Sequence, residues 1–330
     1  MKKIIFICLT VAICVTLLAG CGNSTSGNNG YKIAVVAKST ANPWWQRMKE
    51  GIDAYNKEHG TNYFFGGPTD PVDQASYLEQ LLAEDWDAIC IAPYDSESIA
   101  PIFEKAKKDG IVIIAHEAST MDPQFFTYDI EPFTPKEYGE NFAKQLIEMT
   151  GGEGTYIQFV SSLNTISHME WCNAAQAYLE ANSDLQFLGR YEATEDMTYA
   201  YNQTKELLQA HPEINAIECS GSGEIPGAAR AIEELGLAGK IAIVGTTMGS
   251  LAAEYVRDGT VPSFSLWDSA ISGKAMVALA EKVLSEGENF DPENCTLDVP
   301  GYEKMTFADG VYYGSARIDV TIDNLDKYNY

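Results

Sequence analysis

Short apolar runs alternate with amphipathic stretches along most of the chain after residue 30. The short runs have the length of buried strands, whereas the longer stretches repeat their apolar positions every three to four residues, as helices do. We expect strands at 32–37, 63–65, 88–92 and 111–115 and helices at 44–58, 70–85 and 97–108. This alternation predicts right-handed βαβ crossovers and a parallel sheet.

A second series begins at Thr134-Pro135-Lys136-Glu137, which has the form of a capping box with proline at the first helical position. The order of elements around residues 87–114 is repeated around residues 215–244, which predicts two lobes of one α/β architecture. We expect strands at 155–159, 185–191, 216–219 and 241–245, and helices at 167–181, 199–209, 226–235 and 269–285.

The first residues have the order of a secretory signal. Lys2 and Lys3 precede an apolar stretch at 4–18 that is short for a membrane span, and Leu18-Ala19-Gly20-Cys21 ends it. An ordinary signal peptide with a chance cysteine is the simpler alternative. We favour a bacterial lipobox with Cys21 as the lipidation site, because residues 21–30 then form a Gly/Ser/Asn-rich tether. We therefore expect an extracytoplasmic protein that meets the membrane only through its lipid.

Chain length and net charge limit the number of domains and the class of partner that we expect. About 300 residues follow the signal, which is more than one core usually serves and favours two domains. A formal net charge of −25 argues against a nucleic-acid partner, because phosphates would repel this surface.

Four cysteines follow the signal and the lipid site: Cys90, Cys172, Cys219 and Cys295. Cys90 and Cys219 fall inside apolar strand patterns, so we expect them to be small buried side chains. The spacing predicts no zinc framework, and a disulfide such as Cys172–Cys295 stays open.

Ligands of open α/β sheets bind beyond the carboxyl ends of the strands, so residues that follow the predicted strands are the candidate site. They mix indoles, charged groups and hydroxyls, as a sugar requires: its C–H faces pack on aromatic rings, while its buried hydroxyls need donors and acceptors. A carboxylate such as Glu117 accepts from neighbouring hydroxyls, and Lys38 donates. The ligand-binding candidates read from strand ends are Lys38, Trp44, Trp45, Glu117, Ser167, His168, Trp267 and Asp268.

Each candidate also has a structural interpretation. Trp44 and Trp45 open a helix and could pack on their own lobe, and a loop lysine such as Lys38 is commonly solvated. A lone histidine such as His168 is more often structural, and Trp267 with its neighbour could form a hinge or core element.

Enzyme motifs are broken or absent from the sequence. Gly221-Ser222-Gly223 with Gly227 misses the dinucleotide fingerprint by one residue, and there is no Walker A loop, H-E-x-x-H or G-x-S-x-G. We expect a protein that is not an enzyme and that has no catalytic residue, metal or cofactor.

The lipobox, the Asn-Pro-Trp-Trp after the first strand and the two echoing halves together resemble the ribose-type (type I) periplasmic sugar-binding proteins of ABC importers. Three further motifs resemble the autoinducer-2 and rhamnose-binding branch of that family. They are Gly67-Pro68-Thr69-Asp70-Pro71, Leu266-Trp267-Asp268 and Asn324-Leu325-Asp326-Lys327-Tyr328. The resemblance implies two Rossmann-like lobes joined by a three-segment hinge. It implies an N-terminal lobe of 31–132 plus about 267–298 and a C-terminal lobe of 133–266 plus about 299–330.

The resemblance also implies roles for particular residues. A lysine after the first strand, paired aromatic residues and an acidic residue after the fourth strand correspond to Lys38, Trp44 with Trp45, and Glu117. A proline and an alanine that open a second-lobe helix correspond to Pro226 and Ala228. Where the autoinducer-2 receptors have an Asp-Gln pair, this chain has Ser167-His168, so rhamnose or another small polyol or sugar stays open as the ligand.

Three functions follow from these features. The leading hypothesis is capture of a sugar-like ligand and its delivery to an ABC permease in the membrane. The second is presentation of the ligand to a chemoreceptor or a sensor kinase. The third is an exported sugar-modifying enzyme, for which no motif is present.

Overall fold

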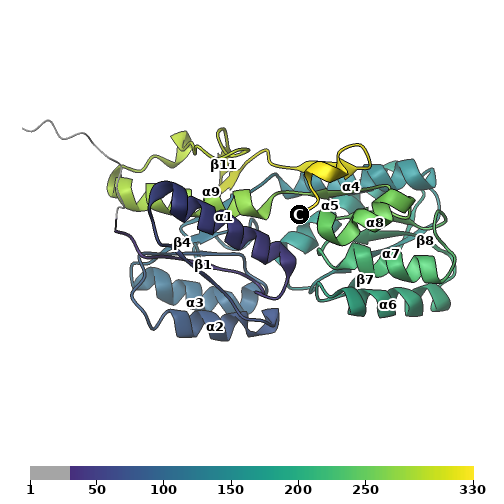
Figure 1. The fold of residues 1–330 in the computed structure, drawn as a ribbon, viewed down its shortest axis with the longest axis horizontal. Helices are drawn as coiled ribbons and strands as arrows, with labels where there is room; N and C mark the ends of the chain where they lie inside the picture. The colour runs from purple at the N-terminus through teal and green to yellow at the C-terminus, as the bar shows by residue number, and fades with distance from the viewer. Residues whose placement is uncertain (1–29) are drawn as a thin grey trace, which may run out of the picture.

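The computed structural model describes residues 30–330, which form two α/β lobes that lie side by side (Figure 1). The predicted signal peptide and the lipidation site at Cys21 lie outside the described residues. None of the helices in the described part of the chain is long and apolar enough to span a membrane.

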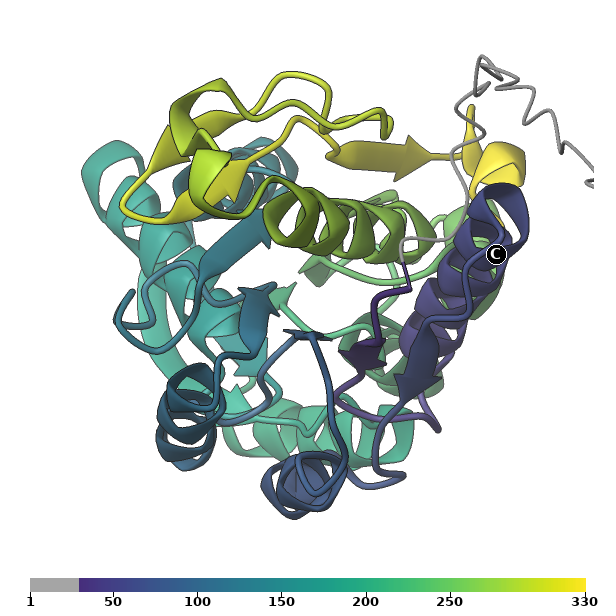
Figure 2. The same cartoon turned by 90° about the vertical axis from the view of Figure 1, so that its left-hand side faces the viewer.

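The first lobe is built on a seven-stranded sheet in the order β11-β12-β5-β4-β3-β1-β2, parallel except for the antiparallel pair β11–β12. Helices α1 and α9 pack against one face of this sheet, and α2 and α3 cover the opposite face (Figure 2). The strands are β1 Ile33–Val36, β2 Phe64–Gly66, β3 Ala88–Ile91, β4 Val112–Ala115, β5 Tyr128–Glu131, β11 Thr306–Ala308 and β12 Val311–Tyr313. The helices are α1 Pro43–His59, α2 Gln74–Leu81, α3 Ser96–Lys108 and α9 Ser269–Glu286.

The second lobe has a four-stranded parallel sheet in the order β7-β6-β8-β9. A bridge between Thr246 and Ser265 joins it to the antiparallel pair β10–β13. The strands are β6 Thr155–Val160, β7 Gln186–Glu192, β8 Ile214–Cys219, β9 Ala242–Gly245, β10 Ser263–Leu266 and β13 Ile318–Thr321. The helices are α4 Pro135–Thr150, α5 Ile166–Asn182, α6 Met197–Ala210, α7 Glu224–Glu234 and α8 Gly249–Asp258. Short 3₁₀ turns are η1 Pro71–Asp73, η2 Gly287–Asn289, η3 Pro292–Asn294 and η4 Leu325–Lys327.

Helix starts follow from capping chemistry that is visible in the sequence. The side chain of Asn42 accepts a hydrogen bond from the backbone N–H of Trp44 at 2.9 Å, and Pro43 occupies the first turn of α1. Thr134 caps α4 through the N–H of Glu137 at 3.4 Å, as the predicted capping box requires. Because α1 begins directly after the loop that follows β1, its first residues are held at the edge of the sheet.

The chain passes between the lobes three times, after β5, after β10 and after β12. The predicted α/β class, parallel sheets and three-segment hinge are therefore confirmed. One part of the expected layout differs: residues 299–330 were assigned to the C-terminal lobe, yet β11 and β12 complete the first-lobe sheet and only β13 returns to the second lobe. The cause is the parallel pairing of β12 with β5, where Tyr312 lies opposite Ile130 and both side chains are buried.

The four cysteines of the described residues are free and buried. Cys90 lies in β3 and Cys219 ends β8, as small buried side chains of the two cores. Cys172 contacts the hydroxyl of Ser220 at 3.3 Å, so a Cys172–Cys295 disulfide is not formed.

Candidate functional site

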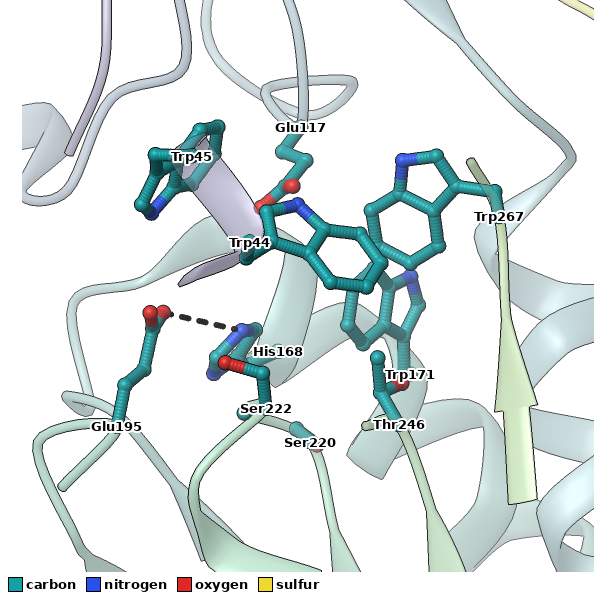
Figure 3. Close-up of a pocket in the computed structure, with 11 residues that line it drawn as sticks. Trp44, Trp45, Glu117, His168, Trp171, Glu195, Ser220, Ser222, Thr246 and Trp267 are labelled. Carbon is teal, nitrogen blue, oxygen red and sulfur yellow. Dashed lines mark ion pairs between the residues drawn. The ribbon is translucent and has the colours of Figure 1, made fainter. Parts of the chain in front are cut away.

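A narrow cavity lies between the two lobes (Figure 3). Its first-lobe wall comes from the start of α1, the loop after β4 and the connection between β10 and α9. Its second-lobe wall comes from α5 and from the loops after β7, β8 and β9, which follow the carboxyl ends of the parallel strands. The lining residues are Trp44, Trp45, Glu117, His168, Trp171, Glu195, Ser220, Gly221, Ser222, Thr246 and Trp267.

A buried ion pair supports the first-lobe wall. Lys38 Nζ lies 2.6 Å from Glu117 Oε2, and the two side chains are only 1% and 4% exposed. Burial alone would lower the pKa of Lys38, but the charges of Glu117 and Glu195 and the hydrogen bond to Glu117 outweigh it, and the pKa is raised above its ordinary value. The ammonium also lies 5.6 Å from the ring centre of Trp45. Lys38 therefore stays charged and holds both Glu117 and an indole in place.

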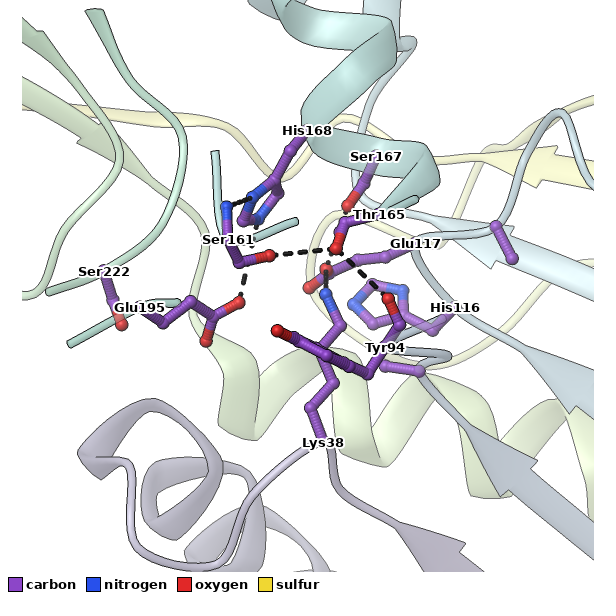
Figure 4. A network of polar contacts seen from close by, with 12 residues as sticks. Lys38, Tyr94, His116, Glu117, Ser161, Thr165, Ser167, His168, Glu195 and Ser222 are labelled. Carbon is purple, nitrogen blue, oxygen red and sulfur yellow. Dashed lines mark hydrogen bonds and ion pairs between the residues drawn. The ribbon is translucent and has the colours of Figure 1, made fainter. Parts of the chain in front are cut away.

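Side chains of the second lobe reach this pair in the network of Figure 4. The hydroxyl of Ser167, in the first turn of α5, donates to Glu117 Oε2 at 3.2 Å. Close by, the hydroxyl of Thr165 donates to the backbone carbonyl of Tyr94 at 3.1 Å. These bonds join the lobes, so the structure has the closed arrangement of the cleft.

Asn42 makes a further link between the lobes. Its side-chain amide donates to Glu195 Oε2 and to Ser222 Oγ, each at 3.2 Å. The same side chain caps α1 through its oxygen, so one residue fixes the helix start and spans the cleft.

His168 is a neutral hydrogen-bond donor in the second-lobe wall. Its Nδ1 accepts the backbone N–H of Ser161 at 3.0 Å, which places the ring proton on Nε2. Burial, and then the charge of Lys38, lowers the pKa of His168 well below its usual value. Nε2 faces Glu195 Oε1 at 3.8 Å, which is too long for a direct hydrogen bond.

Four of the five tryptophans line the cavity. Trp44 meets Trp267 edge to face with ring centres 4.6 Å apart, and Trp171 meets Trp267 at 5.6 Å. The buried indole nitrogens of Trp45 and Trp267 have no hydrogen-bond partner within the described residues. A buried donor without a partner is costly to stability.

The structure brings most of the predicted site residues together. Trp44, Trp45, Glu117, His168 and Trp267 line the cavity, and Lys38 and Ser167 lie directly behind Glu117.

The other three predicted site residues, Pro226, Ala228 and Asp268, do not line the cavity. Pro226 and Ala228 are buried inside α7. Asp268 caps α9 and pairs with Arg47 at 2.8 Å, so its carboxylate is already engaged. A binding role for these three residues has no support from the geometry.

Six lining residues were not among the ligand-binding candidates: Trp171, Glu195, Ser220, Gly221, Ser222 and Thr246. Two of them could have been found from signals in the sequence. Glu195 follows the predicted strand at 185–191, so the rule that selected Glu117 would also have selected it. Trp171 lies one helical turn after Ser167 and on the same face of α5. The helix predicted at 167–181 already implied that these two residues share a face.

A family model described as "Periplasmic binding protein domain" matches residues 33–289. A D-ribose/D-allose-binding protein of Pseudomonas aeruginosa is 28% identical over 246 residues, which cover 70% of this chain and 75% of that protein. A ribose import binding protein of Bacillus subtilis is 24% identical over 304 residues, which cover 86% and 94%.

Two solved structures have a similar fold. LsrB from Clostridium saccharobutylicum in complex with AI-2 superposes with a TM-score of 0.82 at 20% identity, covering 91% of this chain and all of that one (100%). An ABC transporter solute-binding protein from Clostridium phytofermentas with bound L-rhamnose gives 0.83 at 19% identity, covering 91% and 98%. At these identities the likeness concerns the fold alone.

Proposed function

The chain belongs to the periplasmic binding protein family, and we propose that it captures a monosaccharide-sized ligand between its lobes for an ABC importer. Membership confirms the predicted resemblance to type I sugar-binding proteins of ABC transporters. The relatives are binding proteins of transport systems, and this chain is likewise not an enzyme.

One observation carries the proposal: the cavity has walls from both lobes, and its chemistry suits a small polyol. Indole rings offer flat apolar faces, while Glu117 and Glu195 offer acceptors and His168 offers a donor. Because contacts come from both sides of a hinge, a ligand stabilises the closed form relative to the open one. Capture and closure are then one event.

The size and the polar groups of the cavity define the ligand further. The space between the lining side chains is narrow, so a ligand held there is no larger than one monosaccharide. Two fold neighbours are described with AI-2 and with L-rhamnose, and we propose that this ligand belongs to the same size class. Of the Ser167-His168 pair only His168 lines the cavity, and its neutral imidazole suits a hydroxyl of a small sugar or polyol.

Family membership places the protein outside the cytoplasm, and we propose that Cys21 carries the lipid that keeps it at the membrane. The closed form would then dock on a permease whose ATPase is a separate chain. Transport names among the relatives favour import over presentation to a chemoreceptor or a sensor kinase.

Isothermal titration calorimetry with AI-2, L-rhamnose, D-ribose, D-allose and D-fucose tests the proposal. We expect at least one of them to bind with a micromolar or tighter dissociation constant, and the binding to be lost in Lys38→Met. Failure of every small sugar and polyol to bind at millimolar concentration would contradict the proposed function.

A further inference from the structure

We propose that the ligand carries a positively charged amino group, and that Glu195 is its counter-ion in the cavity. This inference rests on the proposed function and names the chemical class of the ligand: an amino sugar or a similar small polyol amine.

The inference starts from the charges that face the cavity. Glu117 and Glu195 both line it, whereas Lys38, the one cation beside them in residues 30–330, is bound to Glu117 at 2.6 Å. His168 is neutral, because burial lowers its pKa well below the usual value. Glu224 lies behind the wall, and burial raises its pKa to about 8, which favours its neutral form at neutral pH. When both carboxylates are ionised, the ammonium of Lys38 balances only one of them.

Glu195 carries the unbalanced charge. Its direct partner is the amide of Asn42, which donates to one carboxylate oxygen at 3.2 Å. The other oxygen faces His168 Nε2 at 3.8 Å without a hydrogen bond. The side chain is only 13% exposed, so water screens it poorly. Burial raises the pKa of Glu195, and the charge of Lys38, which is already paired with Glu117, offsets this rise only in part. An ammonium group of the ligand beside Glu195 would stabilise its charged form.

The backbone supports a ligand-binding role for both carboxylates. Glu117 has φ 58° and Glu195 has φ 56°, and Thr194 beside it has φ 53°. Residues with a Cβ rarely adopt this left-handed region, and such strain gathers at functional sites. Within residues 30–330, Asp309 is the one other non-glycine residue with positive φ. Two of these four residues are therefore the carboxylates of one cavity.

The aromatic walls suit the same group. Indole faces attract cations, and an ammonium held between a carboxylate and tryptophan rings gains from both contacts. Trp44 and Trp45 lie on the first-lobe side of the cavity, opposite Glu195 and His168 (Figure 3). A neutral hydroxyl in this place would satisfy a hydrogen bond but would leave the charge of Glu195 uncompensated. An acidic sugar would add repulsion.

The test compares matched ligands on the mature wild-type chain by isothermal titration calorimetry. The pairs are D-glucosamine with D-glucose, D-galactosamine with D-galactose and D-mannosamine with D-mannose, with the N-acetylated sugars and D-glucuronate beside them. We expect at least one amine to bind tenfold or more tightly than its neutral partner, N-acetylation to remove the advantage, and glucuronate not to bind.

Glu195→Gln keeps the shape of the side chain and removes its charge, so it should abolish the preference for the amine. Glu206→Gln, an exposed residue of α6, makes the same chemical change away from the cavity and should leave the preference intact. A neutral sugar that binds as tightly as its amine would overturn the inference and leave the proposed function standing. If no sugar of either kind binds, both are contradicted. The wild-type comparison decides the matter even if Glu195→Gln does not fold.

Discussion

Lys38 Nζ and Glu117 Oε2 form an ion pair at 2.6 Å that is almost fully buried in the wall of the interlobe cavity. Removal of one partner leaves an uncompensated charge, so Lys38→Met should lower the free energy of unfolding by about 3–5 kcal/mol. Urea denaturation measures this loss. The double variant Lys38→Met/Glu117→Gln should recover most of the stability but no ligand binding. Equal stability of the single and double variants would show that the pair is not coupled.

A second prediction concerns pH and the carboxyl groups where β5 meets α5. Burial raises the pKa of Asp129 to about 7, and burial together with Asp129 raises the pKa of Glu131 well above its ordinary value. Burial also raises the pKa of Glu170, which accepts from the Ser119 hydroxyl across the cleft. No cation is among the groups that shift the pKa values of these three carboxyl groups.

The sign follows from proton binding. Between the ordinary pKa of Asp129, 3.8, and its folded value of about 7, the folded chain binds more protons than the unfolded chain, so stability falls as pH rises. Asp129→Asn should flatten this fall and make the protein more stable than wild type at pH 8. Thermal unfolding from pH 5 to pH 8 measures both effects. An unchanged slope would show that Asp129 is ionised throughout.

Tryptophan emission should report ligand binding, because four of the five indoles line the cavity. Trp45→Ala should weaken binding by about thirtyfold, equivalent to about 2 kcal/mol for a buried aromatic anchor. Trp86→Phe is the control, because Trp86 donates to the carbonyl of Leu81 beside α2, outside the cavity. It should leave both the affinity and the fluorescence change intact. A fluorescence change that disappears only in Trp86→Phe would contradict the site.

Variants of Asn42 can distinguish its role as the cap of α1 from its role in the hydrogen bonds between the lobes. Asn42→Ala removes both the helix cap and the bonds to Glu195 and Ser222, so it should cost about 1 kcal/mol of stability and speed ligand release. Asn42→Ser keeps a capping oxygen but is too short to span the cleft. It should retain the wild-type melting temperature and still release ligand several-fold faster in stopped-flow experiments. Equal release rates for Asn42→Ser and wild type would mean that the interlobe bonds do not hold the closed form.

Much of this architecture could be predicted from local signals. Apolar runs located the parallel strands, and caps at Asn42 and Thr134 fixed helix starts. In a parallel sheet, residues after the strands share one edge, so Lys38 and Glu117 were expected to meet although 79 positions separate them.

The rest of the fold and of the site depends on contacts that no local sequence pattern encodes. Strand β12 pairs with β5 across about 180 positions, and its three residues carry too little periodicity to name a partner. Asp268 was expected at the ligand, but its carboxylate pairs with Arg47 and caps the first turn of α9. Side-chain partners of this kind are decided by packing between lobes rather than by position after a strand.

The late return of the chain to the first sheet has a consequence for secretion. Strand β5 gains its outer neighbour only when residues 311–313 are present, near the end of a chain of 330 residues. Pairing over such a span is slow, because a long loop must close before the contact forms. A newly made chain would therefore stay incompletely folded until residues 311–313 have been made, and an unfolded chain is what a protein-threading channel accepts.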